Sequence, residues 1–250
     1  MPIALVTGAT AGLGAEFARQ LAGRGYDLVA VARDVERLEA TRDALAKVSV
    51  EVLPADLVTD QGCATVAERL GRGDIDLLVN NAGIGAYKPF GDAELEREEA
   101  QLDLNVRAVL RLTHAAVRAM RERGSGRIVN VSSVAGFLPR GGNATYSASK
   151  AWVTMFSEAL SVQLTGSGVT VTAVCPGFTH TEFHERANAD MSHVPDRMWL
   201  DAKDVVREGL DAALAGKAVS VPSRRYKVLV GATRALPRPV LRAVMARRGM

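Results

Sequence analysis

Residues 7–14 read Thr-Gly-Ala-Thr-Ala-Gly-Leu-Gly and join a short apolar run, Pro2–Thr7, to a segment of helical period, Gly12–Arg24. We interpret the apolar run as a buried strand that leads into a glycine turn. Glycines spaced G-x-x-x-G-x-G let the backbone turn sharply and come close to a pyrophosphate, whose charge then lies at the positive N-terminus of the helix. A tight strand-to-helix connection without a ligand is the alternative, because a glycine-rich turn alone is a weak signal.

The alternation of strand and helix continues along the chain. Continuous apolar strands are typical of a sheet that is covered on both faces. The order of elements predicts a Rossmann-like α/β fold, a doubly wound parallel sheet of about seven strands with helices on both faces. Further strands are expected at Asp27–Ala32, Val50–Pro54, Asp76–Asn80, Arg127–Val131, Thr170–Cys175 and Ala218–Val221, and further helices at Val35–Lys47, Asn105–Arg123, Tyr146–Thr165 and Asp201–Ala215.

Length and composition favour one folded unit. A chain of 250 residues with 48% hydrophobic and 24% charged residues can bury a substantial core, and no linker divides it. We therefore expect a single dinucleotide-binding and catalytic domain over residues 1–250. A segment of about residues 178–200 lacks clear periodicity and is expected to be a substrate loop. It carries His180, His184, His193, Pro195 and Trp199.

The N-terminus and the cysteines favour a cytoplasmic location. An apolar strand begins within two residues of Met1, so we expect no secretion signal. The sequence contains no run of 18 uninterrupted apolar residues, so we expect no membrane-spanning helix. Cys63 and Cys175 lie far apart, without a CxxC or Cys/His cluster, so we expect neither a disulfide framework nor a structural zinc site.

The positive charge is concentrated in a C-terminal tail of about residues 224–250. From Ala212 to Met250 the chain has nine Lys or Arg and no acidic residue, whereas the other 211 residues have 22 basic against 28 acidic residues, a net of −6. The pI of about 9.0 is therefore mostly a property of the tail. Because aromatic residues are not interleaved with these cations, we expect no nucleic-acid partner.

Apolar residues alternate with the cations of the tail at near-helical spacing, interrupted by Gly231, Pro237 and Pro239. One hypothesis is peripheral contact with anionic lipid. The alternative is that the tail packs on a partner subunit or over the substrate pocket.

Tyr146 and Lys150 form a candidate proton-transfer pair. Tyrosine has an ordinary pKa near 10, so it needs a neighbouring cation to act near neutral pH, and residues four apart on a helix share one face. Alone, Y-x-x-x-K is more often a solvent-facing pair. Here Tyr146 follows a glycine-rich loop beyond a strand that ends near Ser132-Ser133, where open α/β sheets bind ligands.

Several motifs, taken in order, resemble the short-chain dehydrogenase/reductase family. The resemblance runs from about Pro2 to Thr181 and weakens beyond. It implies a nicotinamide-dependent oxidoreductase of the Rossmann type. The matching residues are the TGxxxGxG turn, the NNAG motif Asn80-Asn81-Ala82-Gly83, the polar residues Asn105 and Ser133, the YxxxK motif from Tyr146 to Lys150, and Pro176-Gly177.

The resemblance assigns roles to four catalytic residues. Tyr146 would donate a proton to a carbonyl oxygen while the nicotinamide delivers hydride, and Ser133 would hold that oxygen. Lys150 would also bind the nicotinamide ribose, and Asn105 would hold a water for proton exchange. Ser132 is the alternative to Ser133, and Asn105 has the alternative of a satisfied buried amide.

The residue after the second strand favours NADP(H). By resemblance, a carboxylate at the end of this strand binds the adenosine ribose in NAD-dependent members, but the position here is Ala32. Arg33 follows and could hold a 2′-phosphate, although a solvated loop cation is the alternative. NAD(H) is the alternative cofactor. Asp56, with Leu57 beside it, would bind the adenine amino group, or would simply form a turn.

The other expected cofactor contacts also come from the resemblance. We interpret Cys175 as a small buried hydrophobe. His180 and His184 do not match a zinc motif, so no metal is expected. The remaining cofactor-binding candidates are Gly8, Thr10, Gly12, Leu13, Gly14, Asn81, Ala82, Gly83, Pro176, Gly177, Thr179 and Thr181.

The resulting hypothesis is an NADP(H)-dependent enzyme that interconverts a ketone or aldehyde and an alcohol. Phe178, Phe183, Met191 and Trp199 in the loop favour an apolar small-molecule substrate, and the resemblance implies a homodimer or homotetramer. The alternatives are an NAD-dependent alcohol dehydrogenase on the same scaffold and a non-catalytic NADP-binding regulator.

Overall fold

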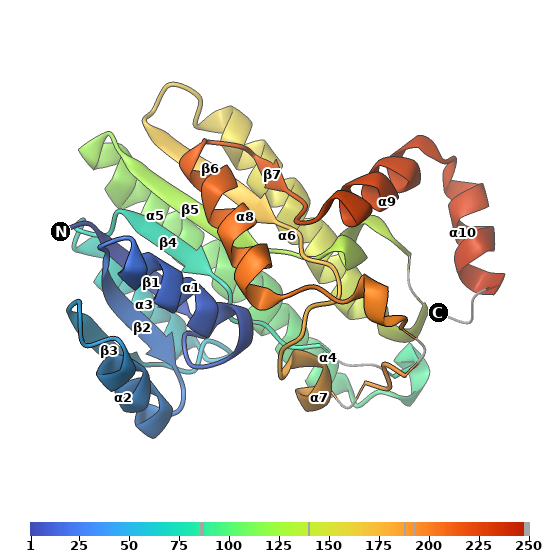
Figure 1. Cartoon of the computed structure of the whole chain (residues 1–250), viewed down its shortest axis with the longest axis horizontal. Coiled ribbons are helices and arrows are strands. Elements are labelled where there is room, and N and C mark those ends of the chain that lie inside the picture. The colour runs from blue at the N-terminus through green and yellow to red at the C-terminus, as the bar shows by residue number, and fades with distance from the viewer. Residues whose placement is uncertain (86–87, 140, 188, 193, 248–250) are drawn as a thin grey trace.

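A computed structural model describes residues 1–85, 88–139, 141–187, 189–192 and 194–247, and within it the strands form one parallel sheet. The spatial order is β3-β2-β1-β4-β5-β6-β7, so the chain winds outward from β1 in both directions (Figure 1). This confirms the predicted doubly wound α/β fold. The strands are β1 (Ile3–Thr7), β2 (Asp27–Ala32), β3 (Val50–Pro54), β4 (Leu77–Asn80), β5 (Gly126–Val131), β6 (Val169–Val174) and β7 (Val219–Ser220).

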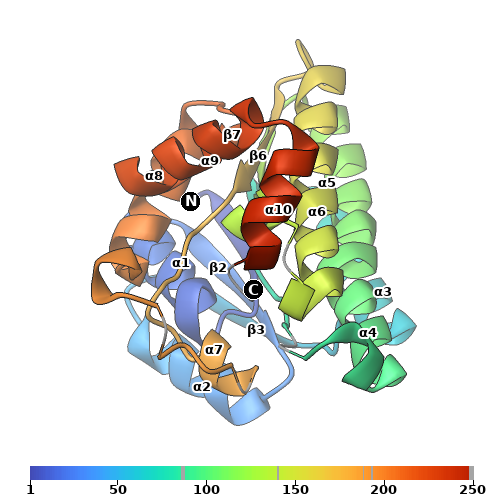
Figure 2. The ribbon, with the colours of Figure 1, turned by 90° about the vertical axis from the view of Figure 1, so that its right-hand side faces the viewer.

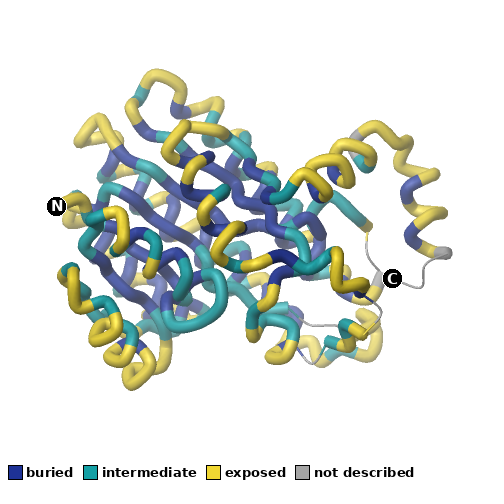
Figure 3. The backbone as a smooth tube through the Cα atoms, viewed as in Figure 1, coloured by how far each residue is buried: buried dark blue, intermediate teal, exposed yellow. Residues whose placement is uncertain are grey.

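Helices cover both faces of the sheet (Figure 2). On one face, Phe17 of α1 (Gly12–Gly23), Leu38 of α2 (Val35–Ala44) and Leu210 of α8 (Ala202–Leu214) share a core with β1, β2 and β4. On the other, α3 (Asp60–Gly71) and α5 (Val109–Arg123) pack on the sheet, and α6 (Ala144–Gln163) lies beside β5 and β6. The central strands are buried almost throughout (Figure 3), as their continuous apolar sequences predict, whereas the edge strand β3 is only partly buried.

The structure adds elements that the sequence-based expectation lacked. Helix α3 connects β3 to β4, and the Thr59 hydroxyl caps it by accepting a hydrogen bond from the Gly62 N–H at 3.0 Å. Helix α4 (Leu95–Leu102) precedes α5, and the two are joined by a π-helical segment, Asp103–Ala108. The expected helix over Asn105–Arg123 therefore begins with a widened turn. Short 3-10 turns lie at Phe90–Asp92, Val134–Phe137, Gly141–Asn143 and Asp196–Met198.

The C-terminal tail is two helices, α9 (Arg224–Ala235) and α10 (Arg238–Arg247). The expectation that Gly231 interrupts the helical pattern is wrong. A glycine costs only about 1 kcal/mol in a helix, and α9 is held on the body of the protein by buried Tyr226 and Val230. Pro237 does separate the helices, whereas Pro239 lies in the first turn of α10, where proline is tolerated. Arg248 lies outside the described residues.

The segment expected to be the substrate loop contains some regular structure. Backbone pairing between Thr179 and Leu200 closes its base, and it contains the short helix α7 (Phe183–Arg186). His193 lies outside the described residues. Within the described part of the chain, no helix has both the length and the hydropathy needed to cross a bilayer.

Candidate active site

A cavity of about 700 Å³ opens at the carboxyl ends of the strands. Because β1, β2, β4, β5 and β6 are parallel, the residues that follow them meet at one edge of the sheet. The segment after β6, including residues of α7, also lines the cavity.

The glycine turn after β1 needs its glycines for two different reasons. Gly8 has a φ of +67° and Gly12 a φ of +51°, both in the left-handed region that glycine favours. Gly14 needs space, because a Cβ there would lie 2.0 Å from the carbonyl oxygen of Gly8. This close packing brings the N-terminus of α1 against the cavity, where backbone N–H groups can bind phosphate.

Thr7 and Asn81 hold this turn in place. The Thr7 hydroxyl accepts hydrogen bonds from the N–H groups of Asn81 (2.9 Å) and Ala82 (3.0 Å), and it donates to the Val79 carbonyl at 3.3 Å. The Asn81 amide donates to the carbonyl of Thr7 at 3.0 Å. The sequence-based site did not include Thr7, although its place at the end of β1 is a usable signal.

The opposite end of the cavity carries the adenosine candidates. Arg33 is exposed and lines the cavity, and it forms no ion pair with any residue that the structure describes. The Asp56 carboxylate accepts a hydrogen bond from the Val58 N–H at 3.1 Å, so it forms the turn that was the alternative reading, while it still faces the cavity. Leu57 beside it is 5% exposed.

Tyr146 and Lys150 lie in the first turns of α6, on the side facing the cavity. Both are buried, at 8% and 5% exposure, and the Lys150 Nζ lies 5.7 Å from the centre of the Tyr146 ring. The ammonium donates to the Val131 carbonyl at 2.9 Å, which ties it to the end of β5.

Burial lowers the pKa of Lys150 to about 8, because the low-dielectric interior disfavours the charged form. At pH 7 the lysine is still mostly protonated. A positive charge this close favours the anionic form of the Tyr146 phenol.

The two serines after β5 have different surroundings. The Ser132 hydroxyl lies 2.7 Å from both the Lys150 carbonyl and the Thr154 hydroxyl, so its hydrogen bonds are made to α6. Ser133 caps the following 3-10 turn by accepting from the Ala135 N–H at 3.1 Å, which leaves its O–H donor available. Both line the cavity, but this difference favours Ser133 as the group that binds a substrate.

Asn105 lies in the π-helical segment and is fully buried. Its amide pairs with the backbone of Ile84, accepting from the N–H at 3.0 Å and donating to the carbonyl at 2.8 Å. It does not line the cavity itself. A Cβ on Gly83 would lie 3.0 Å from the Asn105 Oδ1 and 3.4 Å from the Lys150 Nζ, so a side chain at this position would crowd both polar groups.

The segment after β6 is attached to both the glycine turn and the tail. Thr181 packs against Gly12, where an added Cβ would lie 3.2 Å from the threonine Cβ. The buried Tyr226 hydroxyl of α9 accepts from the Phe178 N–H at 3.1 Å and donates to the Met198 carbonyl at 2.8 Å. Tyr226 thus attaches the tail to the loop, although no described residue of the tail lines the cavity itself. Tyr226 was missed because it is 48 residues from Phe178 in sequence.

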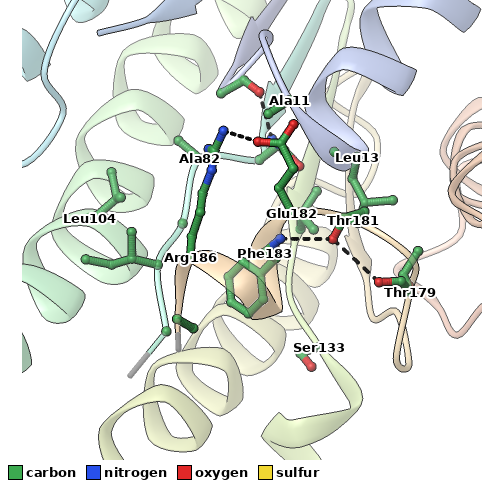
Figure 4. Close-up of a pocket in the computed structure, with 18 of the residues that line it drawn as sticks. Ala11, Leu13, Ala82, Leu104, Ser133, Thr179, Thr181, Glu182, Phe183 and Arg186 are labelled. Atoms are coloured by element: carbon green, nitrogen blue, oxygen red, sulfur yellow. Dashed lines mark hydrogen bonds and ion pairs between the residues drawn. The ribbon is translucent and has the colours of Figure 1, made fainter. Parts of the chain in front are cut away.

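Side chains of α7 and the residue before it reach into the cavity (Figure 4). The ring of Phe183 lies 5.7 Å from that of Tyr146. Glu182 forms ion pairs with Arg186 and, at 3.3 Å, with Arg37 of α2. Sequence reasoning did not identify the Arg37–Glu182 pair, because it joins positions 145 residues apart. It also missed Arg186, although the four-residue spacing from Glu182 is a usable signal.

The histidines of the loop belong to an aromatic cluster. The His180 ring stacks on Trp199 with centroids 4.8 Å apart, and His184 meets Trp199 edge-on at 5.3 Å. Among the described residues, no group of three His, Cys, Asp or Glu side chains could hold a metal ion. Cys175 is fully buried, consistent with a packing role.

The structure brings most of the expected site residues to one cavity. Gly14 and Asn105 are the exceptions, since each supports a neighbour that does line it. The combination of a cradle kept free of Cβ atoms, a helix N-terminus and the Arg33 cation fits a dinucleotide. The cavity-lining candidates are Gly8, Thr10, Gly12, Leu13, Arg33, Asp56, Leu57, Asn81, Ala82, Gly83, Ser133, Tyr146, Lys150, Pro176, Gly177, Thr179 and Thr181.

Comparison with known proteins gives consistent matches. The sequence model for short chain dehydrogenases matches residues 2–192. An uncharacterized oxidoreductase from Myxococcus xanthus is 38% identical over 234 residues, covering 90% of this chain and 92% of that protein.

Two solved structures are similar over almost the whole chain. A short-chain dehydrogenase from Sphingobium yanoikuyae, in complex with NADPH, is 37% identical with a TM-score of 0.86 and covers 94% of each chain. The bulky-bulky ketone specific alcohol dehydrogenase from Comamonas testosteroni is 32% identical with a TM-score of 0.81, covering 95% of this chain and 96% of that one.

Proposed function

The chain belongs to the short-chain dehydrogenase/reductase family of oxidoreductases, and from this membership we propose that it interconverts a carbonyl compound and an alcohol with NADP(H). The observation that carries the proposal is the meeting of Tyr146, Lys150 and Ser133 at one cavity. Their chemistry is a proton donor, a cation that stabilises its anion, and a hydroxyl that can bind the reacting oxygen.

We propose the following roles in the reductive direction. The Ser133 hydroxyl donates a hydrogen bond to the carbonyl oxygen and holds it near Tyr146. Tyr146 gives its phenolic proton to that oxygen as negative charge develops there, and the Lys150 ammonium stabilises the tyrosinate left behind. A bound nicotinamide supplies the hydride. In alcohol oxidation the proton moves from the alcohol to Tyr146 and the hydride moves to the nicotinamide.

The residues that would hold the cofactor also have separate tasks. The glycine turn and the N-terminus of α1 would bind the pyrophosphate, and Arg33 would bind the 2′-phosphate. Asn105 positions Ile84 and lies beside Gly83 and Lys150, so we propose that it maintains the route by which the lysine exchanges protons. The NADPH complex of the Sphingobium yanoikuyae relative supports the choice of cofactor.

The cavity favours an apolar carbonyl substrate. Phe183 lies against the Tyr146 ring, and Phe178, His184 and Trp199 form an aromatic cluster behind it. The similar Comamonas testosteroni enzyme is described as specific for bulky-bulky ketones. We therefore propose ketones with an apolar group on each side of the carbonyl.

The test compares wild type with Tyr146→Phe on a panel of aldehydes, small ketones and bulky ketones, by the loss of NADPH absorbance. We expect the variant to lose about 10²–10⁴ in kcat and to bind NADPH as before. Tyr26→Phe is the matched control, because Tyr26 is half-buried outside the cavity.

Each other outcome would favour a different function, cofactor or substrate. NADPH binding without turnover on the whole panel would favour the non-catalytic regulator, and equal or tighter NADH binding would favour the NAD-dependent enzyme. A panel in which only small, polar carbonyls react would rule out the apolar substrate. Binding of neither nucleotide contradicts the proposal.

We also propose a cytoplasmic homo-oligomer whose tail can touch a membrane. Large apolar side chains are exposed on α5 and α6, as a subunit interface would require. On the tail, Val228, Val240 and Val244 are exposed among cations, which suits anionic lipid. Pelleting with phosphatidylserine vesicles tests whether the tail binds lipid. Recovery of equal amounts of protein in the pellet with and without vesicles would contradict lipid binding. Cell fractionation checks the location.

A further inference from the structure

Three charged side chains form a chain across one side of the cavity. Arg37 is in the first turn of α2, beside the end of β2, and its guanidinium lies 3.3 Å from the Glu182 carboxylate. Arg186 of α7 pairs with the same carboxylate. All three line the cavity. The Glu182 carboxylate thus lies between two arginines of the same chain, at the place where a phosphate-bearing ligand is expected.

Glu182 follows a residue that is packed on the glycine turn. Thr181 packs against Gly12, and Figure 4 shows the Glu182 carboxylate paired with Arg186. Arg37 lies four residues after Arg33, and both arginines line the cavity close to the end of β2. The Arg37–Glu182 pair therefore joins the adenosine side of the cavity to the segment that covers the nicotinamide side.

We propose that Arg37 is a second binding residue for the 2′-phosphate and that Glu182 competes with the phosphate for it. The inference rests on the proposed NADP(H) function. When the 2′-phosphate binds, Arg37 exchanges the carboxylate for the phosphate, and Glu182 keeps Arg186 as its partner. With a ligand that lacks the 2′-phosphate, Arg37 stays on Glu182.

The energetics make the exchange feasible. The side chains of Arg37 and Glu182 are 43% and 47% exposed, and half-exposed ion pairs contribute little. A phosphate monoester carries up to two negative charges and can bind a guanidinium through two hydrogen bonds. Competition from Glu182 therefore weakens the selectivity for the 2′-phosphate without removing it.

The experiment measures binding of 2′,5′-ADP and 5′-AMP by calorimetry, because these ligands differ only at the 2′-position and need no turnover. We expect Arg37→Ala to weaken 2′,5′-ADP binding about tenfold or more and to leave 5′-AMP binding unchanged. Glu182→Gln, which frees Arg37, should tighten 2′,5′-ADP binding about two- to fivefold. Arg42→Ala is the control, because Arg42 is on α2, pairs with Asp43 and lies outside the cavity.

The outcomes separate this inference from the proposed function. If Arg33→Ala weakens 2′,5′-ADP binding selectively but Arg37→Ala does not, the role of Arg37 is overturned while the NADP(H) proposal stands. If Arg37→Ala affects both ligands equally, Arg37 only attaches the loop to α2. If Glu182→Gln leaves 2′,5′-ADP binding unchanged or weaker, the competition is overturned. If wild type does not prefer 2′,5′-ADP, both proposals fail.

Discussion

Lys150 combines a proposed catalytic role with a cost in stability. Burial lowers its pKa to about 8 from a usual value of 10.5. Below pH 8 the lysine is protonated in both the folded and the unfolded chain, so the folded protein bears the full cost of the buried charge. Between pH 8 and 10.5 only the unfolded chain keeps the proton. The contribution of Lys150 to stability therefore improves as the pH rises through this range.

We predict that Lys150→Met abolishes turnover and raises the free energy of unfolding at pH 7 by up to about 3 kcal/mol. The advantage of the variant over wild type should shrink as the pH rises from about 8 to 10. Urea unfolding at several pH values measures this difference. Lys203→Met, at an exposed position, should change stability little. A Lys150→Met protein less stable than wild type at pH 7 would show that the bond to Val131 outweighs the burial of charge.

The sequence identified Tyr146 and Lys150 because helical spacing places them on one face. The family resemblance favoured Ser133, with Ser132 as the alternative. The difference lies in their partners, since Ser132 bonds to α6 while Ser133 caps a turn. Arg37 and Glu182 were not predictable, because nothing local marks two charges that meet only after folding.

At the scale of elements, the turn between β1 and α1 leaves no room for a side chain at Gly14. Gly14 is on α1, where its Cβ position lies 2.0 Å from the Gly8 carbonyl oxygen and 2.4 Å from the Asn81 amide nitrogen. Gly23 ends the same helix with nothing within 4 Å. The two glycines therefore make a matched pair in one element.

We predict that Gly14→Ala lowers the free energy of unfolding by about 2 kcal/mol or more and abolishes NADPH binding, because α1 must move away from the turn. Gly23→Ala should be neutral or stabilising by up to about 1 kcal/mol, since alanine is the better helix former. Thermal unfolding and a binding titration on both variants check this. Similar losses in both would show that helix propensity, and not the close approach of α1, governs the turn.

The strands and the long helices were predictable from apolar runs and helical period. Helix α3 was not included, although Cys63, Val66 and Leu70 have helical spacing and pack in the core. Helix α9 continues through Gly231 because Tyr226 and Val230 bury its inner face. The local sequence predicted a break in the helix at Gly231, but the tertiary packing of these two side chains keeps the helix continuous.

For the molecule as a whole, the outer face of α6 remains uncovered in one chain. Met155 and Val162 are 67% and 76% exposed and lie two helical turns apart on the same face. Large exposed apolar side chains gathered on one face are typical of a subunit interface. The tail offers a competing surface, because Val228 on α9 is 73% exposed.

We predict that the wild-type protein is an oligomer of its 26.6 kDa chain and that the double substitution Met155→Glu and Val162→Glu converts it to a monomer. Carboxylates at the centre of an apolar interface lose their hydration without gaining a partner, which costs several kcal/mol per charge. Val228→Glu tests the competing surface and should leave the assembly intact. Light scattering after size exclusion measures the mass of all three proteins. If Val228→Glu alone dissociates the protein, the tail and not α6 joins the subunits.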